Sequence, residues 1–137
     1  MLDKLPEFIA NHYILSTSFI VLAGLFFANE ARRGGRNLSS GELTALVNGG
    51  KAVVVDIRPH KEFSTGRISG ALNIPHDKLE TRMVELEKHK EHTIILVDAA
   101  GLHAGIACTA LQKAGYQAVR LAGGMQTWRN DSLPVVK

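Results

Sequence analysis

Hydrophobic residues follow one pattern near the N-terminus of this chain and another in the rest of it, and the longer C-terminal part is the more regular. There, two short runs are almost entirely apolar, which is typical of strands covered on both faces of a parallel sheet. Between such runs, apolar residues recur at helical spacing. The pattern predicts strands at 52–56, 72–74, 93–97 and 117–121, helices at 77–87 and 102–114, and a helical turn after Pro59. Strands that alternate with helices indicate an α/β domain with a mostly parallel sheet.

A helix-capping pattern opens this domain. Ser39 stands three residues before Glu42, which is the spacing of a capping box, where each side chain binds the other residue's backbone N–H. A short helix is expected to follow, with Leu43 facing inward, and to stop at the glycine pair 49–50.

The N-terminal part is continuously apolar. Residues 13–28 carry no charge. Crossing a hydrocarbon core of about 30 Å takes about 20 helical residues, so a single transmembrane helix is predicted at about 12–29, with His12 and Asn29 at the interfaces. The predicted organisation is an N-terminal segment at 1–33 that contains this helix, a linker at 34–37, and a domain at 38–137.

Two other interpretations of the apolar segment stay open. A cleaved signal peptide would need a basic start, whereas Asp3 and Glu7 accompany Lys4, and the residues after Phe27 form a poor cleavage site. A buried helix of a soluble protein is the other interpretation. Both fit the pattern less well than an uncleaved anchor.

Basic residues flank the predicted span mainly on one side. Arg32, Arg33 and Arg36 follow it, whereas only Lys4 precedes it. Because basic residues near a span stay on the cytoplasmic side, the C-terminal domain is predicted to face the cytoplasm.

Composition narrows the functional classes. The chain has 137 residues, enough for one domain, and a formal net charge of only +3. No basic stripe is interleaved with aromatic residues, so nucleic acid is not an expected partner. A single cysteine excludes an intramolecular disulfide, and the histidines lack metal-ligand spacing, so neither a metal nor a cofactor is expected.

Candidate chemistry concentrates where the second apolar strand ends. Asp98 follows that strand and precedes Gly101 and a predicted helix, so its carboxylate should lie where backbone N–H groups converge on an anion. A cysteine there would be an activated thiolate, but a carboxylate attacks poorly. The only cysteine, Cys108, lies within helical sequence and is expected to be a buried small hydrophobe.

Two signatures resemble those of the rhodanese-like domains. The first runs from Asp56 to Pro75 and has the form D-x-R-x-x-x-E-[FY]-x-x-G-H-I-x-G-A-x-x-[IL]-P, except that Arg67 replaces the usual His. The second is Gly123-Gly124-Met125-Gln126-Thr127-Trp128 followed by Pro134, which matches G-G-x-x-x-W and a later proline. The resemblance spans residues 38–136 and implies a five-stranded, largely parallel sheet with helices on both faces.

The resemblance also implies a site. In active members a cysteine opens a six-residue loop and carries a persulfide held by loop amides. The corresponding loop here is Asp98, Ala99, Ala100, Gly101, Leu102 and His103. Asp98 therefore stands at the nucleophile position, and His103 stands where an arginine is common. The residues expected to support the loop are Asp56, Arg58, Glu62 and Arg67, with Asp56 and Arg58 bracing it and Glu62 accepting from its amides.

Three interpretations of Asp98 are open: a cap for the loop and the next helix, a pocket for a cationic or amide ligand, or an aspartyl nucleophile or metal ligand. With the predicted anchor, the chain resembles small membrane-anchored rhodanese-homology proteins of Gram-negative bacteria, which implies the inner membrane. The first functional hypothesis is a catalytically inactive module that binds another membrane or membrane-proximal protein. The alternative is a sulfurtransferase with a non-standard site. In a third functional hypothesis the membrane helix itself binds the partner, because it carries small or hydroxylated residues that suit helix packing: Ser16, Thr17, Ser18 and Gly24.

Overall fold

The computed structural model describes residues 2–32 and 36–137. It divides into two compact units, an N-terminal one up to residue 32 and a C-terminal one from residue 33 onward, and each is described by itself.

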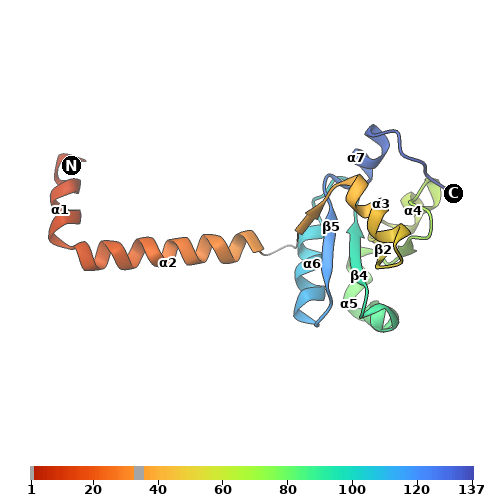
Figure 1. Ribbon diagram of the computed structural model, residues 1–137, viewed down its shortest axis with the longest axis horizontal. Coiled ribbons are helices and arrows are strands. Elements are labelled where there is room, and N and C mark those ends of the chain that lie inside the picture. The colour runs from red at the N-terminus through yellow and green to blue at the C-terminus, as the bar shows by residue number, and fades with distance from the viewer. Residues whose placement is uncertain (1, 33–35) are drawn as a thin grey trace. The chain divides into compact units, whose positions relative to one another are not determined.

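The N-terminal unit consists of helices on either side of His12. A 3-10 turn, η1 (Leu2–Lys4), leads into α1 (Leu5–Asn11), and α2 (Tyr13–Arg32) follows (Figure 1). His12 separates the two helices because its backbone, at φ −122° and ψ 42°, leaves the helical region. Within the described residues, no single helix meets the length and hydropathy that membrane crossing requires, whereas the segments Leu2–Asn11 and Tyr13–Asn29, bent by 99°, meet them together. That α2 crosses a membrane stays a prediction.

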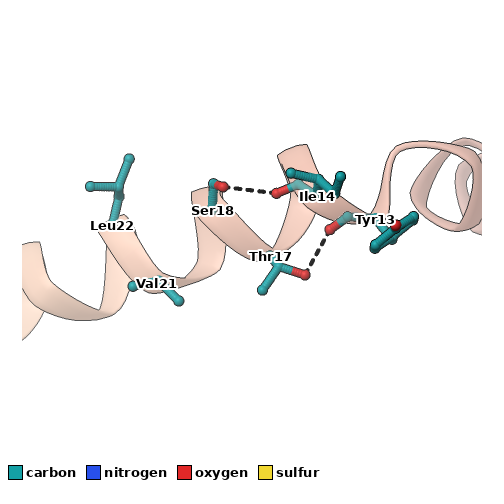
Figure 2. A pocket seen from close by; sticks show the side chains of 6 residues that line it. All are labelled: Tyr13, Ile14, Thr17, Ser18, Val21 and Leu22. Atoms are coloured by element: carbon teal, nitrogen blue, oxygen red, sulfur yellow. Dashed lines mark hydrogen bonds between the residues drawn. The ribbon is translucent and has the colours of Figure 1, made fainter.

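The surface of α2 is apolar. All of its large hydrophobic side chains from Tyr13 to Phe27 are exposed. Figure 2 shows that the hydroxyl groups of Thr17 and Ser18 turn back along the helix and donate to the carbonyls of Tyr13 (2.7 Å) and Ile14 (2.8 Å). Because these hydroxyl groups are satisfied within the helix, they add little polarity to the face that they share with Val21.

The C-terminal unit is built on a five-stranded sheet in the order β1-β5-β4-β2-β3, in which every pair of neighbouring strands is parallel. The strands are β1 (Arg36–Leu38), β2 (Ala52–Asp56), β3 (Leu72–Asn73), β4 (Thr93–Val97) and β5 (Ala118–Leu121). The strands predicted at 52–56 and 93–97 are confirmed. They form the middle of the sheet with β5, where both faces are covered.

Strand β1 corrects the predicted linker at 34–37. Arg36 and Asn37 pair with Val119 and Arg120 of β5, and Arg120 Nε also donates to Asn37 Oδ1 at 2.7 Å. A three-residue edge strand with one buried side chain has no apolar pattern by which to recognise it. The remaining linker residues 34–35, like Arg33 in the predicted flank of the span, lie outside the described residues.

Helices cover both faces of the sheet. The capping box is confirmed at the start of α3 (Ser40–Asn48), and α3 packs with α7 (Gly124–Asn130) on one face through Leu43, Met125 and Trp128. On the other face, α6 (Ala104–Lys113) packs beside the segment between β3 and β4. The short helix α4 (His60–Thr65) follows β2.

The helix predicted at 77–87 is wrong in type. The chain forms η2 (His76–Lys78), α5 (Leu79–Arg82) and η3 (Met83–His89), of which only the middle segment is α-helical. Leu79 and Leu86 are nevertheless buried as the apolar pattern predicts. The pattern therefore located the buried face but did not identify the helix type.

Parallel pairing brings the ends of β2, β4 and β5 to one edge of the sheet. Asp56 ends β2, Asp98 follows β4, and the glycine pair Gly123-Gly124 follows β5 closely. Asp56 and Asp98, two of the predicted site residues, therefore lie at the carboxyl edge of the sheet.

Candidate functional site

The candidate site is built around the carboxylate of Asp98, at the carboxyl edge of the sheet. The residue is 2% exposed, and both of its oxygens accept backbone hydrogen bonds. Oδ1 accepts from the N–H of Gly101 at 2.6 Å, while Oδ2 accepts from His103 at 2.7 Å and from Ala104 at 3.2 Å. The predicted convergence of N–H groups on an anion is confirmed. We call residues 98–103 the Asp98 loop.

The loop also starts the next helix. Ala104 is the first residue of α6, and the capping residue His103 makes no side-chain cap of its own. Asp98 accepts from the backbone N–H of both residues, so it satisfies donors that helix ends leave open. The interpretation of Asp98 as a cap is confirmed, and the cap explains why α6 begins two residues later than predicted.

The glycine pair before α7 makes the close packing of this loop possible. A Cβ on Gly124 would clash with the Asp98 carbonyl oxygen and would lie 2.7 Å from Oδ1, and the residue has φ +60°. The α7 N-terminus then donates from Met125 N to Asp98 O at 2.8 Å and from Gln126 N to Ala99 O at 2.9 Å. This role was not predicted, because the glycines were recognised only as part of a signature.

Asp56 and Arg58 bind each other at the carboxyl edge, and among the described residues neither side chain forms a hydrogen bond with the Asp98 loop that they were expected to brace. Both are buried, and the guanidinium of Arg58 binds the Asp56 carboxylate through Nε and, at 2.7 Å, through Nη2. Nη2 also donates to the carbonyl of Gly66 at 2.7 Å. Asn73, which was not among the predicted residues, donates to the carbonyls of Asp56 and Arg58 and so links β3 to this turn.

Two supporting residues lie elsewhere than expected. Glu62 is exposed, and within the described residues its side chain accepts no hydrogen bond from the Asp98 loop. That prediction is wrong, since Asp98 already occupies the inward-pointing amides. Arg67 stacks its guanidinium over the Phe63 ring at 4.6 Å and forms an isolated backbone bridge with Val136, so it ties the C-terminal segment to the domain.

The other side chains of the Asp98 loop offer few groups that could react or bind a metal. Leu102 is 80% exposed, and the ring of His103 stacks on that of His76 with centroids 4.4 Å apart. In the part of the chain that the structure describes, no group of three or more His, Cys, Asp or Glu residues could hold a metal ion. The interpretations of Asp98 as a metal ligand or a ligand-binding carboxylate therefore gain no support.

Cys108 is fully buried, as predicted. It belongs to the core cluster between α6 and the sheet. Burial raises the pKa of its thiol to about 12, and the carboxylate of Asp98 adds to the increase, whereas Arg120 opposes it. At neutral pH the thiol is therefore protonated and inaccessible.

The family follows from a comparison with known domains. Residues 39–131 match the model of the rhodanese-like domain. The chain belongs to the rhodanese-like domain family. The predicted fold, one α/β domain with a five-stranded parallel sheet and helices, is that of this family.

Similar proteins include both uncharacterized and enzymatic members. The rhodanese-like chain is 34% identical over 143 residues to the uncharacterized protein YibN of Escherichia coli (strain K12), with 99% of each covered. It is 32% identical over 85 residues to a sulfurtransferase of Allochromatium vinosum, covering 61% of this chain and 78% of that protein.

Solved structures share the fold. A rhodanese-related protein of Thermoplasma volcanium has a TM-score of 0.68 and 27% identity over 74% of this chain and 97% of its own. A thiosulfate sulfurtransferase of Pseudomonas aeruginosa has a TM-score of 0.69 and 26% identity, covering 78% of this chain and 21% of its own. The relatives of this domain therefore include sulfurtransferases.

Proposed function

We propose that this rhodanese-like domain is catalytically inactive and serves as a protein-interaction module, tethered by its N-terminal helix to the cytoplasmic face of the bacterial inner membrane. Its partner is another membrane or membrane-proximal protein. The observation that carries the proposal is the Asp98 carboxylate, which fills the inward-pointing amides of the loop with both of its oxygens.

The chemistry of sulfur transfer supports this proposal. The reaction needs a soft nucleophile that can hold a sulfur atom and release it, which is the role of a thiolate. A carboxylate oxygen is hard and holds no sulfane sulfur. An anionic donor such as thiosulfate would also compete with Asp98 for the same N–H groups and would meet its negative charge.

The alternative, a sulfurtransferase with a non-standard site, needs another thiol. Cys108 is the only cysteine of the chain, and it is buried with its thiol pKa raised to about 12. Neither property suits a nucleophile, so the inactive module is the better supported of the two.

Attachment to a membrane is supported by the N-terminal sequence. Residues 13–28 carry no charge, the large apolar side chains of α2 are exposed, and Arg32, Arg33 and Arg36 follow the segment. The similarity to the Escherichia coli protein extends over 99% of both chains and so includes this segment. An exposed apolar helix followed by arginines suits an anchor whose domain faces the cytoplasm.

The proposal is tested first by activity. We expect the purified full chain in detergent to form no thiocyanate from thiosulfate and cyanide above background, with a known sulfurtransferase assayed in parallel. Thiocyanate formation that is lost in an Asp98→Ala or a Cys108→Ala variant would show that the domain is an enzyme.

Topology is tested separately. When fused after Lys137, a reporter that works only in the cytoplasm should be active, and a reporter that works only in the periplasm should be inactive. The chain should also stay in the membrane fraction after a high-salt wash. A periplasmic reporter signal would reverse the orientation. Recovery of the chain in the soluble fraction would remove the anchor from the proposal.

A further inference from the structure

Two arginines from different elements converge beside the Asp98 loop. Arg58 follows β2 and donates from Nη2 to the carbonyl of Gly66 at 2.7 Å. Arg129, near the end of α7, has its own Nη2 only 3.9 Å from the position that a Cβ on Gly66 would occupy. The side chain of Val135 lies nearer to the same position, at 3.4 Å, so both guanidinium groups approach Gly66 beside an apolar side chain.

A cavity of about 240 Å³ opens at this point between α4 and α7. Its polar lining consists of Arg58, Glu62, Thr65, Gln126, Arg129 and Asn130. Of the Asp98 loop only Ala99 contributes, so the cavity is separate from the amides that hold the Asp98 carboxylate. We call it the Arg58–Arg129 pocket.

The pocket has donors without acceptors. Arg58 is 4% exposed, and Asp56 and Gly66 occupy its Nε and Nη2, but its Nη1 donates to no acceptor among residues 2–32 and 36–137. Over the same residues, Arg129 has no ion pair, and Glu62 on the facing helix does not reach it. Among the described residues the buried side-chain nitrogen or oxygen without a partner is Nδ1 of His92, so Nη1 of Arg58 is reached by solvent, and a ligand in the pocket would accept from it in place of water.

The charge of the lining limits what can bind. Asp56 compensates Arg58, and Glu62 opposes the positive charge of Arg129. These four formal charges sum to zero, so the two negative charges of a phosphate group would meet more repulsion from Asp56 and Glu62 than the single charge of a carboxylate would. A carboxylate can accept from two guanidinium groups at once, and the exposed amide side chains of Gln126 and Asn130 can bind a peptide backbone beside it.

We propose that the Arg58–Arg129 pocket binds an acidic side chain, Asp or Glu, presented by the partner protein. This inference rests on the proposed function, because it names the chemical group by which an interaction module of this kind would recognise its partner. It assigns recognition to the space between α4 and α7 and leaves the Asp98 loop as a structural support for α7.

The test uses a minimal acidic probe and its neutral match. The full chain in detergent micelles is titrated with N-acetyl-glutamate methylamide and, separately, with N-acetyl-glutamine methylamide, while backbone and arginine side-chain signals are followed by NMR. We expect the acidic probe alone to shift the signals of Gln126, Arg129 and Asn130.

Charge variants sharpen the test. Arg129→Gln should weaken binding of the acidic probe about twofold to fivefold, and Glu62→Gln should strengthen it about twofold, as exposed charge pairs do. Arg82→Gln is the matched control, since Arg82 lies on α5 and pairs with Glu85, and it should leave binding unchanged. Arg58 is not varied, because its buried ion pair supports the fold.

Three results would overturn the inference: equal responses to both probes, shifts centred on Gly101, His103 and Ala104, or no response to either probe at saturating concentration. The two proposals fail independently. Absence of probe binding leaves the activity assay and its conclusion intact, whereas a positive activity assay makes the domain an enzyme without affecting the measured pocket.

Discussion

The Asp98 loop and the Arg58–Arg129 pocket both gather hydrogen-bond donors at the carboxyl edge of the sheet, but only the loop is filled by the chain's own carboxylate. Asp98 accepts from the N–H groups of Gly101 and His103 in the loop and of Ala104, the first residue of α6. In the pocket, Asp56 takes part of the Arg58 guanidinium, and Nη1 of that arginine has no acceptor within the described residues.

The difference follows from the kind of donor. Backbone N–H groups in a tight loop are fixed in direction and buried, so leaving them unfilled is costly, and an internal anion stabilises the loop permanently. The guanidinium of Arg129, exposed on α7, is hydrated when free and can exchange water for a ligand. The first arrangement suits structure, and the second suits reversible recognition.

The largest expected effect comes from the contact that joins the two regions. In Gly124→Ala the new Cβ would meet the Asp98 carbonyl oxygen at a residue with φ +60°. We expect the free energy of unfolding to fall by about 2–4 kcal/mol in denaturant titration, from clash and backbone strain together. Gly50→Ala is the control, because Gly50 has φ +68° with nothing within 4 Å, and strain alone should cost about 1 kcal/mol. Equal losses in both variants would argue against close packing at Gly124.

Next in size is the loss of the internal anion. Asp98→Ala leaves the N–H groups of Gly101, His103 and Ala104 without their acceptor, and we expect the free energy of unfolding to fall by about 1–2 kcal/mol. Asp77→Ala changes an exposed aspartate of η2 and should stay within about 0.5 kcal/mol of the parent. If the free energy of unfolding is the same in Asp98→Ala and Asp77→Ala, water satisfies the loop amides in place of the carboxylate. The proposed contrast between the two regions would then be lost.

The main features of the fold could be predicted because buried positions are apolar in the sequence. Strands β2 and β4 are covered on both faces, so their apolar runs are unbroken. Strand β1 buries only Leu38 and is held by pairing with β5, so its sequence looks like a linker. The segment from His76 to His89 kept its inward leucines while changing helix type, which apolar spacing alone does not distinguish.

The same reasoning separates the two regions of the site. Asp98 could be placed among N–H groups because the strand, Gly101 and the following helix are contiguous in sequence. The meeting of Arg58 and Arg129 at Gly66 joins three distant segments, and no local pattern marks it. Glu62 was assigned to the loop by resemblance to active members, but it lines the pocket instead.

A substitution in the loop tests whether its donors would still activate a thiol. In Asp98→Cys, made together with Cys108→Ala, we expect the new thiol to titrate well below the ordinary value of about 8.5, because the same N–H groups favour a thiolate. The rate of alkylation as a function of pH measures this. The parent chain is the control, since the thiol of Cys108 is buried and its pKa is raised to about 12. Titration near about 8.5 would mean that the loop needs the carboxylate to hold its shape.

The smallest expected effect on stability belongs to the pocket. Arg129→Gln removes an exposed charge that makes no ion pair among the described residues, so the free energy of unfolding should change by no more than about 0.5 kcal/mol. Thermal and denaturant unfolding of the variant measure this directly. A loss as large as that of Asp98→Ala would show that Arg129 holds α7 against Gly66, and the pocket would then be part of the support rather than an open site. An unchanged stability, together with weaker binding of the acidic probe, would separate the two regions: one carboxylate is built into the chain to hold the loop, and the other is left for a partner to supply.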